Sequence, residues 1–182
     1  MRALVVVADG FEEIEFSGTV DVLRRGGVET VTAAAQNSLE LKGAHGIVMR
    51  ADSLLGNLSG DFSAVVFPGG YRNSQTLGAD LRVRRLLEKQ AASGKWVCAL
   101  CASPALVLSP LGLLKDKKAT CHPSLLNELD AIVTEGSVVT DAPFITSRGP
   151  GTTLAFGLEI VRQLRGEDVA RGLAESMLVA WP

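Results

Sequence analysis

The chain has few of the residues and motifs that mark the commonest functional classes. Its 182 residues include only two histidines and three cysteines. An odd number of cysteines does not form a disulfide framework, and it favours a reducing, cytoplasmic setting. Neither Gly-x-Gly-x-x-Gly nor Gly-x4-Gly-Lys-Ser/Thr is present, so we expect no dinucleotide or nucleoside triphosphate. The two histidines are far apart, no cluster has the spacing of metal ligands, and we expect no metal or other cofactor.

Long apolar runs and blocks of one charge are also missing. The apolar runs are too short to span a membrane, and the first strand begins at once, without the cleavage site of a signal peptide. The formal net charge is −2 with no basic block, so nucleic acid is not an expected partner. Hydrophobic residues make up 47% of the chain, enough for a large core. Length and composition predict a single domain over residues 1–182.

Strand-like and helix-like segments alternate along the chain. Short β-branched or apolar runs predict strands, and segments of helical period bounded by Gly or Asp predict helices. In the helix expected over 80–92, Leu81 is assigned to the buried side. The alternation predicts an α/β fold, a mainly parallel sheet with helices on both faces. The expected strands are 3–8, 29–35, 62–67, 96–100, 118–121 and 144–147, the helices 12–25, 80–92, 151–164 and 167–178, and the hairpins 39–51 and 132–139.

Cys101 stands where the strand over 96–100 meets a short helical stretch over 102–108. A side chain on such a corner is pushed out of the sheet, and the adjoining helix N-terminus favours negative charge. Because the thiolate is the reactive form of cysteine, this placement predicts a nucleophile with a lowered pKa; the alternative is a buried structural cysteine. Cys98 is expected on the other face of the sheet, which argues against a C-x-x-C redox dithiol. Cys121 is left as a candidate resolving cysteine.

Charged and small residues follow several of the expected strands. In open α/β sheets the functional crevice lies at the carboxyl ends of the strands, so these residues are expected on one rim. Glu15, between Ile14 and Phe16, is the best carboxylate: a buried carboxyl near a thiolate tends to stay protonated, and it can donate a hydrogen bond or act as general acid and base. Glu12 and Glu13 are expected to complement the helix dipole.

Backbone N–H groups and one histidine complete the candidate site. The N–H groups of Gly69, Gly70 and Ala102 would form an oxyanion hole, unless the glycines only make a turn. His122 is a candidate to polarise the thiol or carry a proton, the alternative being a histidine in a surface loop. The segment 148–152 is interpreted as a turn and helix cap, with an anion cradle as the alternative. His45, in the hairpin, indicates no role by itself.

These motifs together resemble those of the ThiJ/PfpI superfamily, in the branch of the Parkinson-associated protein DJ-1. The resemblance covers essentially the whole chain and depends on the order and spacing of six segments. They are Ala8-Asp-Gly-Phe-Glu-Glu-Ile-Glu15, Val20-Asp-Val-Leu-Arg-Arg-Gly-Gly27, Phe67-Pro-Gly-Gly70, Ala99-Leu-Cys-Ala-Ser-Pro104, His122-Pro123 and Thr146-Ser-Arg-Gly-Pro-Gly-Thr152. Ser103 departs from the pattern, because the family often has Gly or Ala there.

The resemblance implies a flavodoxin-like sandwich with a nucleophile elbow at Cys101, usually in a homodimer. It implies a protonated Glu15 hydrogen-bonded to the Cys101 thiolate, oxyanion donors at Gly70 and Ala102, and His122 near the thiol. The implied activity is a cofactor-independent glyoxalase of the glyoxalase III type, converting methylglyoxal to lactate, with deglycase activity on glycation adducts. The alternative is a redox sensor or chaperone that acts through oxidation of the same cysteine to sulfinate. A cysteine peptidase or amidotransferase is a third possibility, but Pro123 and Ser124 follow His122 where an amidotransferase carries its acid.

Overall fold

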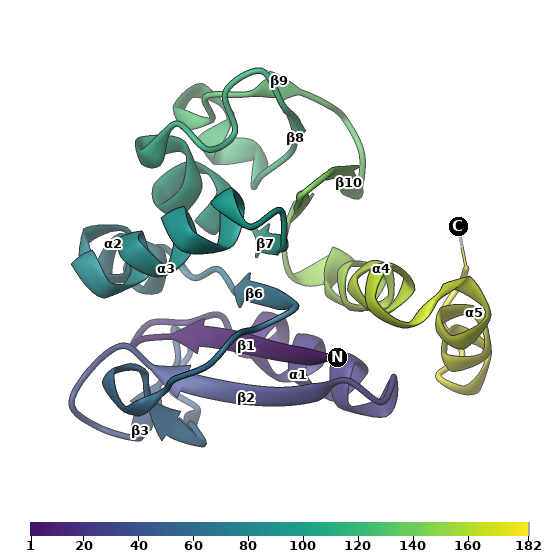
Figure 1. Ribbon diagram of the computed structural model, residues 1–182, viewed down its shortest axis with the longest axis horizontal. Coiled ribbons are helices and arrows are strands. Elements are labelled where there is room, and N and C mark those ends of the chain that lie inside the picture. The colour runs from purple at the N-terminus through teal and green to yellow at the C-terminus, as the bar shows by residue number, and fades with distance from the viewer. Residues whose placement is uncertain (182) are drawn as a thin grey trace.

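Seven strands form one central sheet in the order β10-β11-β7-β6-β1-β2-β5 (Figure 1). The structure is a computed structural model that describes residues 1–181 of the 182. All neighbouring strands of this sheet pair in parallel except the edge strand β10, which is antiparallel to β11. The strands are β1 (Arg2–Val7), β2 (Glu29–Ala34), β5 (Ser53–Leu54), β6 (Ala64–Phe67), β7 (Trp96–Leu100), β10 (Val138–Asp141) and β11 (Phe144–Ser147).

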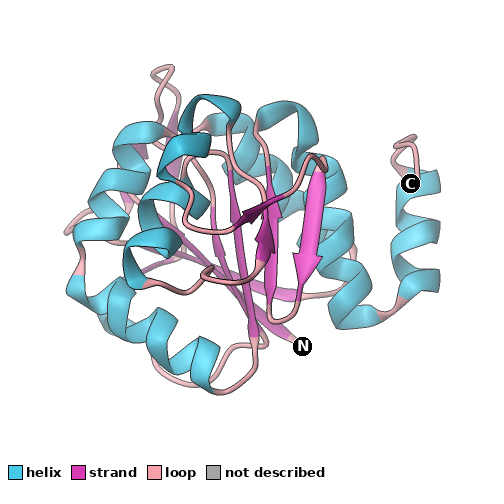
Figure 2. Cartoon of the chain, turned by 90° about the horizontal axis from the view of Figure 1, so that it is seen from above, coloured by secondary structure: helices cyan, strands magenta, loops and turns pink. Residues whose placement is uncertain are grey.

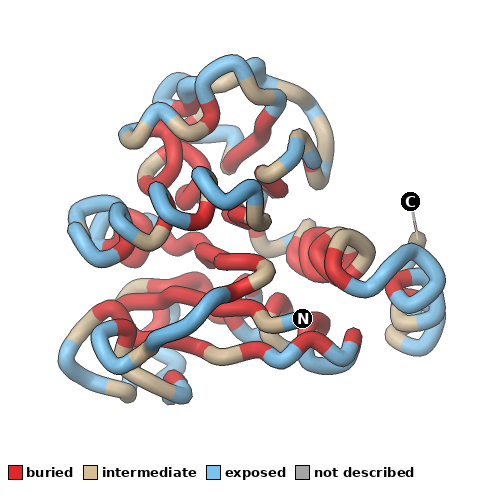
Figure 3. Tube along the Cα trace, in the orientation of Figure 1, coloured by how far each residue is buried: buried red, intermediate tan, exposed pale blue. Residues whose placement is uncertain are grey.

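Helices cover both faces of the sheet, as the sequence predicts (Figure 2). The central strands are buried on both faces, which explains their continuous apolar runs (Figure 3). One core lies under α2 (Tyr71–Ala79) and α3 (Leu81–Ala92), and the other lies under α1 (Glu13–Arg25) and α4 (Thr153–Arg165), with α5 (Glu167–Ser176) packed on α4. The short helices are η1 (Leu55–Asn57), η2 (Pro104–Leu108), η3 (Ser109–Leu111), η4 (Pro123–Glu128) and η5 (Pro150–Thr152).

Two small sheets lie outside the central one. The hairpin predicted over 39–51 is confirmed as the antiparallel pair β3 (Glu40–Lys42) and β4 (Val48–Arg50). The hairpin predicted over 132–139 is wrong, since β9 (Ile132–Val133) pairs in parallel with β8 (Lys118–Ala119). The strand expected over 118–121 is therefore real but short, and it stays outside the central sheet. The antiparallel hairpin in this region is instead β10–β11.

Two further differences concern α2 and α3. The helix α2 is not predicted from the sequence, because its polar residues give no clear apolar stripe. Leu81, assigned to the buried side of α3, is 66% exposed. Gln90 is buried instead, and its Nε2 donates to the carbonyl oxygens of Phe62 and Trp96. Gln90 is buried because it hydrogen-bonds two backbone carbonyl groups near the starts of β6 and β7, and hydrophobic patterning does not predict a buried polar residue there.

Among the described residues, the helices are all too short or too polar to cross a membrane.

Candidate active site

Cys101 lies on a sharp corner directly after β7. Its φ is +60°, a left-handed conformation that is uncommon for a residue with a side chain. Its backbone N–H donates to the carbonyl oxygen of Ser147 at 3.0 Å, and its own carbonyl oxygen accepts from the N–H of His122 at 2.8 Å. Two neighbouring segments thus hold the strained backbone in place, and such overdetermined strain is typical of functional sites.

Glu15 approaches Cys101 from the first turn of α1. The helix begins after Glu12, whose Oε2 accepts from the N–H of Glu15 at 2.8 Å. The Glu15 side chain is fully buried, its Oε2 accepts from the N–H of Gly69 at 2.7 Å, and its Oε1 has no protein partner. Burial raises the pKa of this carboxyl to about 7, although its hydrogen bonds with Cys101 and Gly69 lower the pKa. The raised pKa has the direction expected of a buried Glu15, and at about 7 it leaves the protonated and ionised forms in similar amounts near neutral pH.

The thiol and the carboxyl titrate as a pair. Burial first, and then the charge and hydrogen bonding of Glu15, raise the pKa of Cys101 to about 12, while the N–H groups of Gly70 and Ala102 lower it. The lowered pKa predicted from the corner alone is therefore wrong, because burial is the largest of these effects and an ionised Glu15 adds to it. Between about pH 7 and about pH 12 the pair holds one proton, and moving it from sulfur to Glu15 removes the carboxylate charge and turns the carboxyl into a hydrogen-bond donor.

The two glycines after β6 bring backbone N–H groups to this pair. A Cβ on Gly69 would lie 2.5 Å from the Cβ of Cys101 and 2.6 Å from Oε2 of Glu15, so only glycine fits between them. Gly70 has φ +89°, and a Cβ there would lie 2.1 Å from the carbonyl oxygen of Gly10. The N–H groups of Gly70 and Ala102 reach the thiol from two different segments. This arrangement can stabilise negative charge on sulfur or on an oxygen bonded next to it.

His122 lies at the rim of the site. A Cβ built on Gly149 would be 3.6 Å from Cδ2 of His122 and 4.0 Å from Oε1 of Glu15, so one glycine separates the imidazole from the carboxyl. Nδ1 of His122 pairs with the hydroxyl of Ser124 at 2.7 Å. Because the ring is oriented by a hydroxyl and not by a carboxylate, the described residues do not form the Cys-His-acid arrangement of a peptidase or amidotransferase.

The other two cysteines are fully buried. Cys98 belongs to the core under α1 and α4, as strand alternation predicts, and burial raises its pKa well above the ordinary value. Cys121 belongs to the opposite core, and its thiol donates to the carbonyl oxygen of His122 at 3.4 Å. Cys101 is the half-buried member of the three and borders both cores. Its accessibility favours reaction at Cys101.

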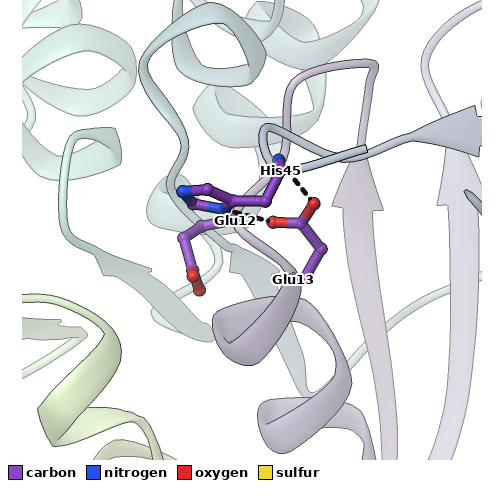
Figure 4. A group of neighbouring side chains, drawn as sticks. All are labelled: Glu12, Glu13 and His45. Carbon is purple, nitrogen blue, oxygen red and sulfur yellow. Dashed lines mark hydrogen bonds and ion pairs between the residues drawn. The ribbon is translucent and has the colours of Figure 1, made fainter. Parts of the chain in front are cut away.

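Glu13 and His45 connect α1 to the β3–β4 hairpin (Figure 4). Oε1 of Glu13 accepts from the backbone N–H groups of His45 and Ile47, and Oε2 pairs with Nδ1 of His45 at 2.9 Å. Glu12, Glu13 and His45 are close enough together to be compared with a metal site. However, both oxygens of Glu13 already accept hydrogen bonds from the hairpin. The cluster is thus accounted for as the contact that fixes the hairpin on the helix.

The segment after β11 forms a closed turn. Oγ1 of Thr152 accepts from the N–H of Gly149 at 3.1 Å and pairs with the hydroxyl of Ser147 at 2.7 Å, while Arg148 is exposed. These contacts favour the interpretation as a turn and cap over that of an anion cradle. Their role is to position Gly149 between His122 and Glu15.

Two buried polar residues beside the site, Asn73 and Ser74, are not predicted from the sequence. They lie in the helix that was not predicted. Their polarity directly after Gly69 and Gly70 was the only available signal.

A corner cysteine, a buried carboxyl and converging backbone N–H groups on a parallel α/β sheet define a class of cysteine-dependent proteins. The chain belongs to the DJ-1/PfpI family, whose model matches residues 1–163. It is 41% identical to the Arabidopsis thaliana protein DJ-1 homolog B over 180 residues, 98% of this chain. It is 29% identical to a deglycase from Thermococcus kodakarensis over 169 residues, 91% of this chain and 100% of that protein.

Structural similarity agrees with the family. The oxidized DJ-1 of Toxoplasma gondii superposes with a TM-score of 0.96 at 31% identity, covering 99% of each chain. The chain spans less than half of the Arabidopsis relatives, 41% of DJ-1 homolog B and 46% of homolog A.

Proposed function

We propose that the protein is a cofactor-independent glyoxalase that converts methylglyoxal to lactate, with deglycase activity on early glycation adducts. The observation that carries the proposal is the convergence of Glu15 and the N–H groups of Gly70 and Ala102 on Cys101. The deglycase among the relatives supports this class of reaction. Because a protein thiol captures the aldehyde, the reaction needs neither a metal nor glutathione.

The reaction begins from the tautomer in which sulfur is ionised and Glu15 is protonated. The Cys101 thiolate attacks the aldehyde carbon, and the N–H groups of Gly70 and Ala102 stabilise the resulting oxyanion, which takes the proton of Glu15 to become a hemithioacetal. The Glu15 carboxylate then removes the proton on C1, which leaves an enediolate with its negative charge on the C2 oxygen. Glu15 returns this proton to C2, and the proton of the C1 hydroxyl passes to the C2 oxygen, so that a C1 carbonyl forms and the product is a lactoyl thioester. Water hydrolyses the thioester to lactate and frees the thiol. His122, at the rim, is the second candidate for the proton transfers.

The test is an assay of purified protein with methylglyoxal and chiral detection of lactate. We expect Cys101→Ala and Cys101→Ser to abolish lactate formation. Cys98→Ala, which alters a buried thiol on the other face of the sheet, should retain it. Full lactate production by Cys101→Ser would overturn the proposal. A single lactate enantiomer is expected, since a fixed group returns the proton to one face of the enediol.

A redox sensor or chaperone is the second candidate function, with Cys101 as the oxidised residue. It is favoured by the exposure of Cys101 relative to Cys98 and Cys121, and by a solved relative in oxidized form. Mass spectrometry after mild peroxide should then find a species with two added oxygens at Cys101. Oxidation spread evenly over the three cysteines would count against it.

We also propose a homodimer in a reducing compartment such as the cytoplasm. Ile14 on α1 and Ile47 and Val48 on the hairpin are 58%, 53% and 61% exposed. The N–H of Ile47 reaches Oε1 of Glu13, so these side chains belong to neighbouring segments. A second copy would cover them, and the thiol of Cys101 would stay reduced. Sedimentation of the wild type and Ile14→Glu is the test: a wild-type monomer at micromolar concentration would contradict the dimer.

A further inference from the structure

Every backbone carbonyl in the Pro68–Gly70 turn is occupied by a buried donor. The carbonyl oxygen of Pro68 accepts from Nδ2 of Asn73 at 2.9 Å and from the hydroxyl of Ser103 at 2.7 Å. The carbonyl oxygen of Gly69 accepts from the same Nδ2 at 3.0 Å and from the N–H of Glu12 at 3.2 Å. The carbonyl oxygen of Gly70 accepts from a backbone N–H of α2 at 2.9 Å. The turn therefore has little freedom to rotate.

Asn73 places both of its amide hydrogens on the carbonyl oxygens of this turn. Its side chain is fully buried; its two N–H hydrogens go to the carbonyl oxygens of Pro68 and Gly69, and its Oδ1 accepts from the N–H of Ala8 at 2.7 Å. Ala8 follows β1 and precedes the loop that leads to Glu15. One amide thus connects the ends of β1 and β6, the two strands whose loops deliver the acid and the glycines.

Ser103 makes the matching connection from the cysteine corner. It lies two residues after Cys101 and is fully buried. Its single hydroxyl hydrogen goes to the carbonyl oxygen of Pro68, so at 2.9 Å the hydroxyl of Ser74 must be the donor to Ser103.

Peptide planarity transmits these contacts to the reactive pair. The carbonyl of Pro68 and the N–H of Gly69 belong to one rigid plane, and so do the carbonyl of Gly69 and the N–H of Gly70. The first plane aims its N–H at Oε2 of Glu15, and the second aims its N–H at the thiol of Cys101. Fixing the two carbonyl oxygens therefore fixes the two donors on the opposite sides of the planes.

We propose that Asn73 and Ser103 are positioning residues for the reactive cysteine, holding the Gly69 and Gly70 peptide planes so that their N–H groups face Glu15 and Cys101. Ser103 acts on the plane that serves Glu15, and Asn73 acts on both planes. Their effect on turnover rests on the proposed function, whereas their effect on thiol reactivity does not. Preorganised donors of this kind are effective because they need no reorientation as charge develops.

The experiment measures alkylation of Cys101 by iodoacetamide from about pH 5 to 10, following the Cys101 peptide by mass spectrometry. In Ser103→Ala, a weaker N–H bond to Glu15 should move the rise of the rate upward by about half to one pH unit. In Asn73→Ala, the rate at about pH 8 should also fall at least tenfold, because the donor to sulfur is no longer fixed. Ser103→Thr, which keeps the hydroxyl, should restore the wild-type profile.

Ser109→Ala is the matched control, since Ser109 is buried, its hydroxyl donates to the carbonyl oxygen of Pro104, and it does not touch the turn. A wild-type profile in folded Ser103→Ala, or the same shift in Ser109→Ala, would overturn the proposal. Should Asn73→Ala not fold, Ser103→Ala and Ser103→Thr decide it. Alkylation requires no aldehyde turnover, so a failed glyoxalase assay would leave this result standing. If both proposals hold, Ser103→Ala lowers kcat for methylglyoxal with little change in KM.

Discussion

Replacing Glu15 with glutamine separates two ways in which the thiol of Cys101 can become a nucleophile. In the wild type, the carboxyl and the thiol lose their first proton together near pH 7 and their second near pH 12. Between these values the pair holds one proton, either on sulfur or on Glu15. The two tautomers contain the same number of protons, so their ratio does not depend on pH. The fraction of reactive thiolate should therefore reach a plateau above about pH 8.

The magnitude follows from these two values. With a first pKa of about 7, the alkylation rate of wild-type Cys101 should rise only about twofold between pH 7 and 9. In Glu15→Gln the thiol titrates alone: burial raises its pKa, and the N–H groups of Gly70 and Ala102 lower it. Because burial is the largest of these effects, the pKa stays above the ordinary value of 9.0 without Glu15, and the rate should rise by close to tenfold per pH unit, roughly 50- to 100-fold over the same interval.

The assay is the pH profile of iodoacetamide alkylation at Cys101, read by mass spectrometry so that Cys98 and Cys121 do not contribute. Glu13→Gln is the control, because Glu13 is a buried carboxyl in the same helical turn as Glu15. Its carboxyl contacts the hairpin and does not contact the thiol. A wild-type rate that increased about tenfold per pH unit from 7 to 9 would refute the shared proton. A plateau in Glu15→Gln would refute the role of Glu15 in producing it.

Three further predictions follow from named contacts. Gly70→Ala should lower the rate of Cys101 alkylation at least about 100-fold, because the new Cβ would collide with the backbone carbonyl oxygen of Gly10. Gly94 also has a positive φ but has open space around it, so Gly94→Ala should lower only the melting temperature. Because folding raises the pKa of Glu15, the wild-type protein loses stability as pH rises from about 4.5 through about 7. Glu15→Gln lacks this titration, so its free energy of unfolding in urea should gain up to about 3 kcal/mol relative to wild type between these two pH values. The hydrogen bond to Glu13 raises the pKa of His45 in the folded protein. The loss of stability in His45→Gln should therefore be largest below about pH 6.5 and disappear as pH rises through the pKa that His45 has in the folded protein.

The layered sheet was predictable because its evidence is local. Alternating apolar runs and glycine stops place strands and helices, and parallel pairing then brings the strand ends, with Glu15, Gly70 and Cys101, to one rim. The pairing of β9 was not predictable, because a two-residue strand gives no period from which a partner can be inferred. The helix α2 has no apolar stripe to predict it, because two of its three buried residues, Asn73 and Ser74, are polar and hydrogen-bond to the neighbouring turn and to Ser103.

Electrostatics shows most clearly where residue-by-residue reasoning stops. The corner and the helix N-terminus predict a lowered thiol pKa, yet burial and an ionised Glu15 raise it to about 12. Both tendencies act on the same sulfur, and which one prevails depends on a proton located on another segment of the chain. The family resemblance implies that Glu15 and Cys101 are paired, but the spacing along the chain does not show how strongly they couple, because the coupling arises where α1 and the β7 corner meet.

The shared proton also bears on whether Cys101 serves catalysis or sensing. Aldehyde attack and peroxide oxidation both begin from the thiolate, so a plateau above about pH 8 would apply equally to the two reactions. They differ in what happens next: the enediol step needs Glu15 to release and recover a proton, whereas oxidation needs only the anion. Glu15→Gln at high pH, where the thiol ionises by itself, should therefore keep oxidation at Cys101 and lose lactate formation. Loss of both, or retention of both, would mean that Glu15 does not distinguish the two functions.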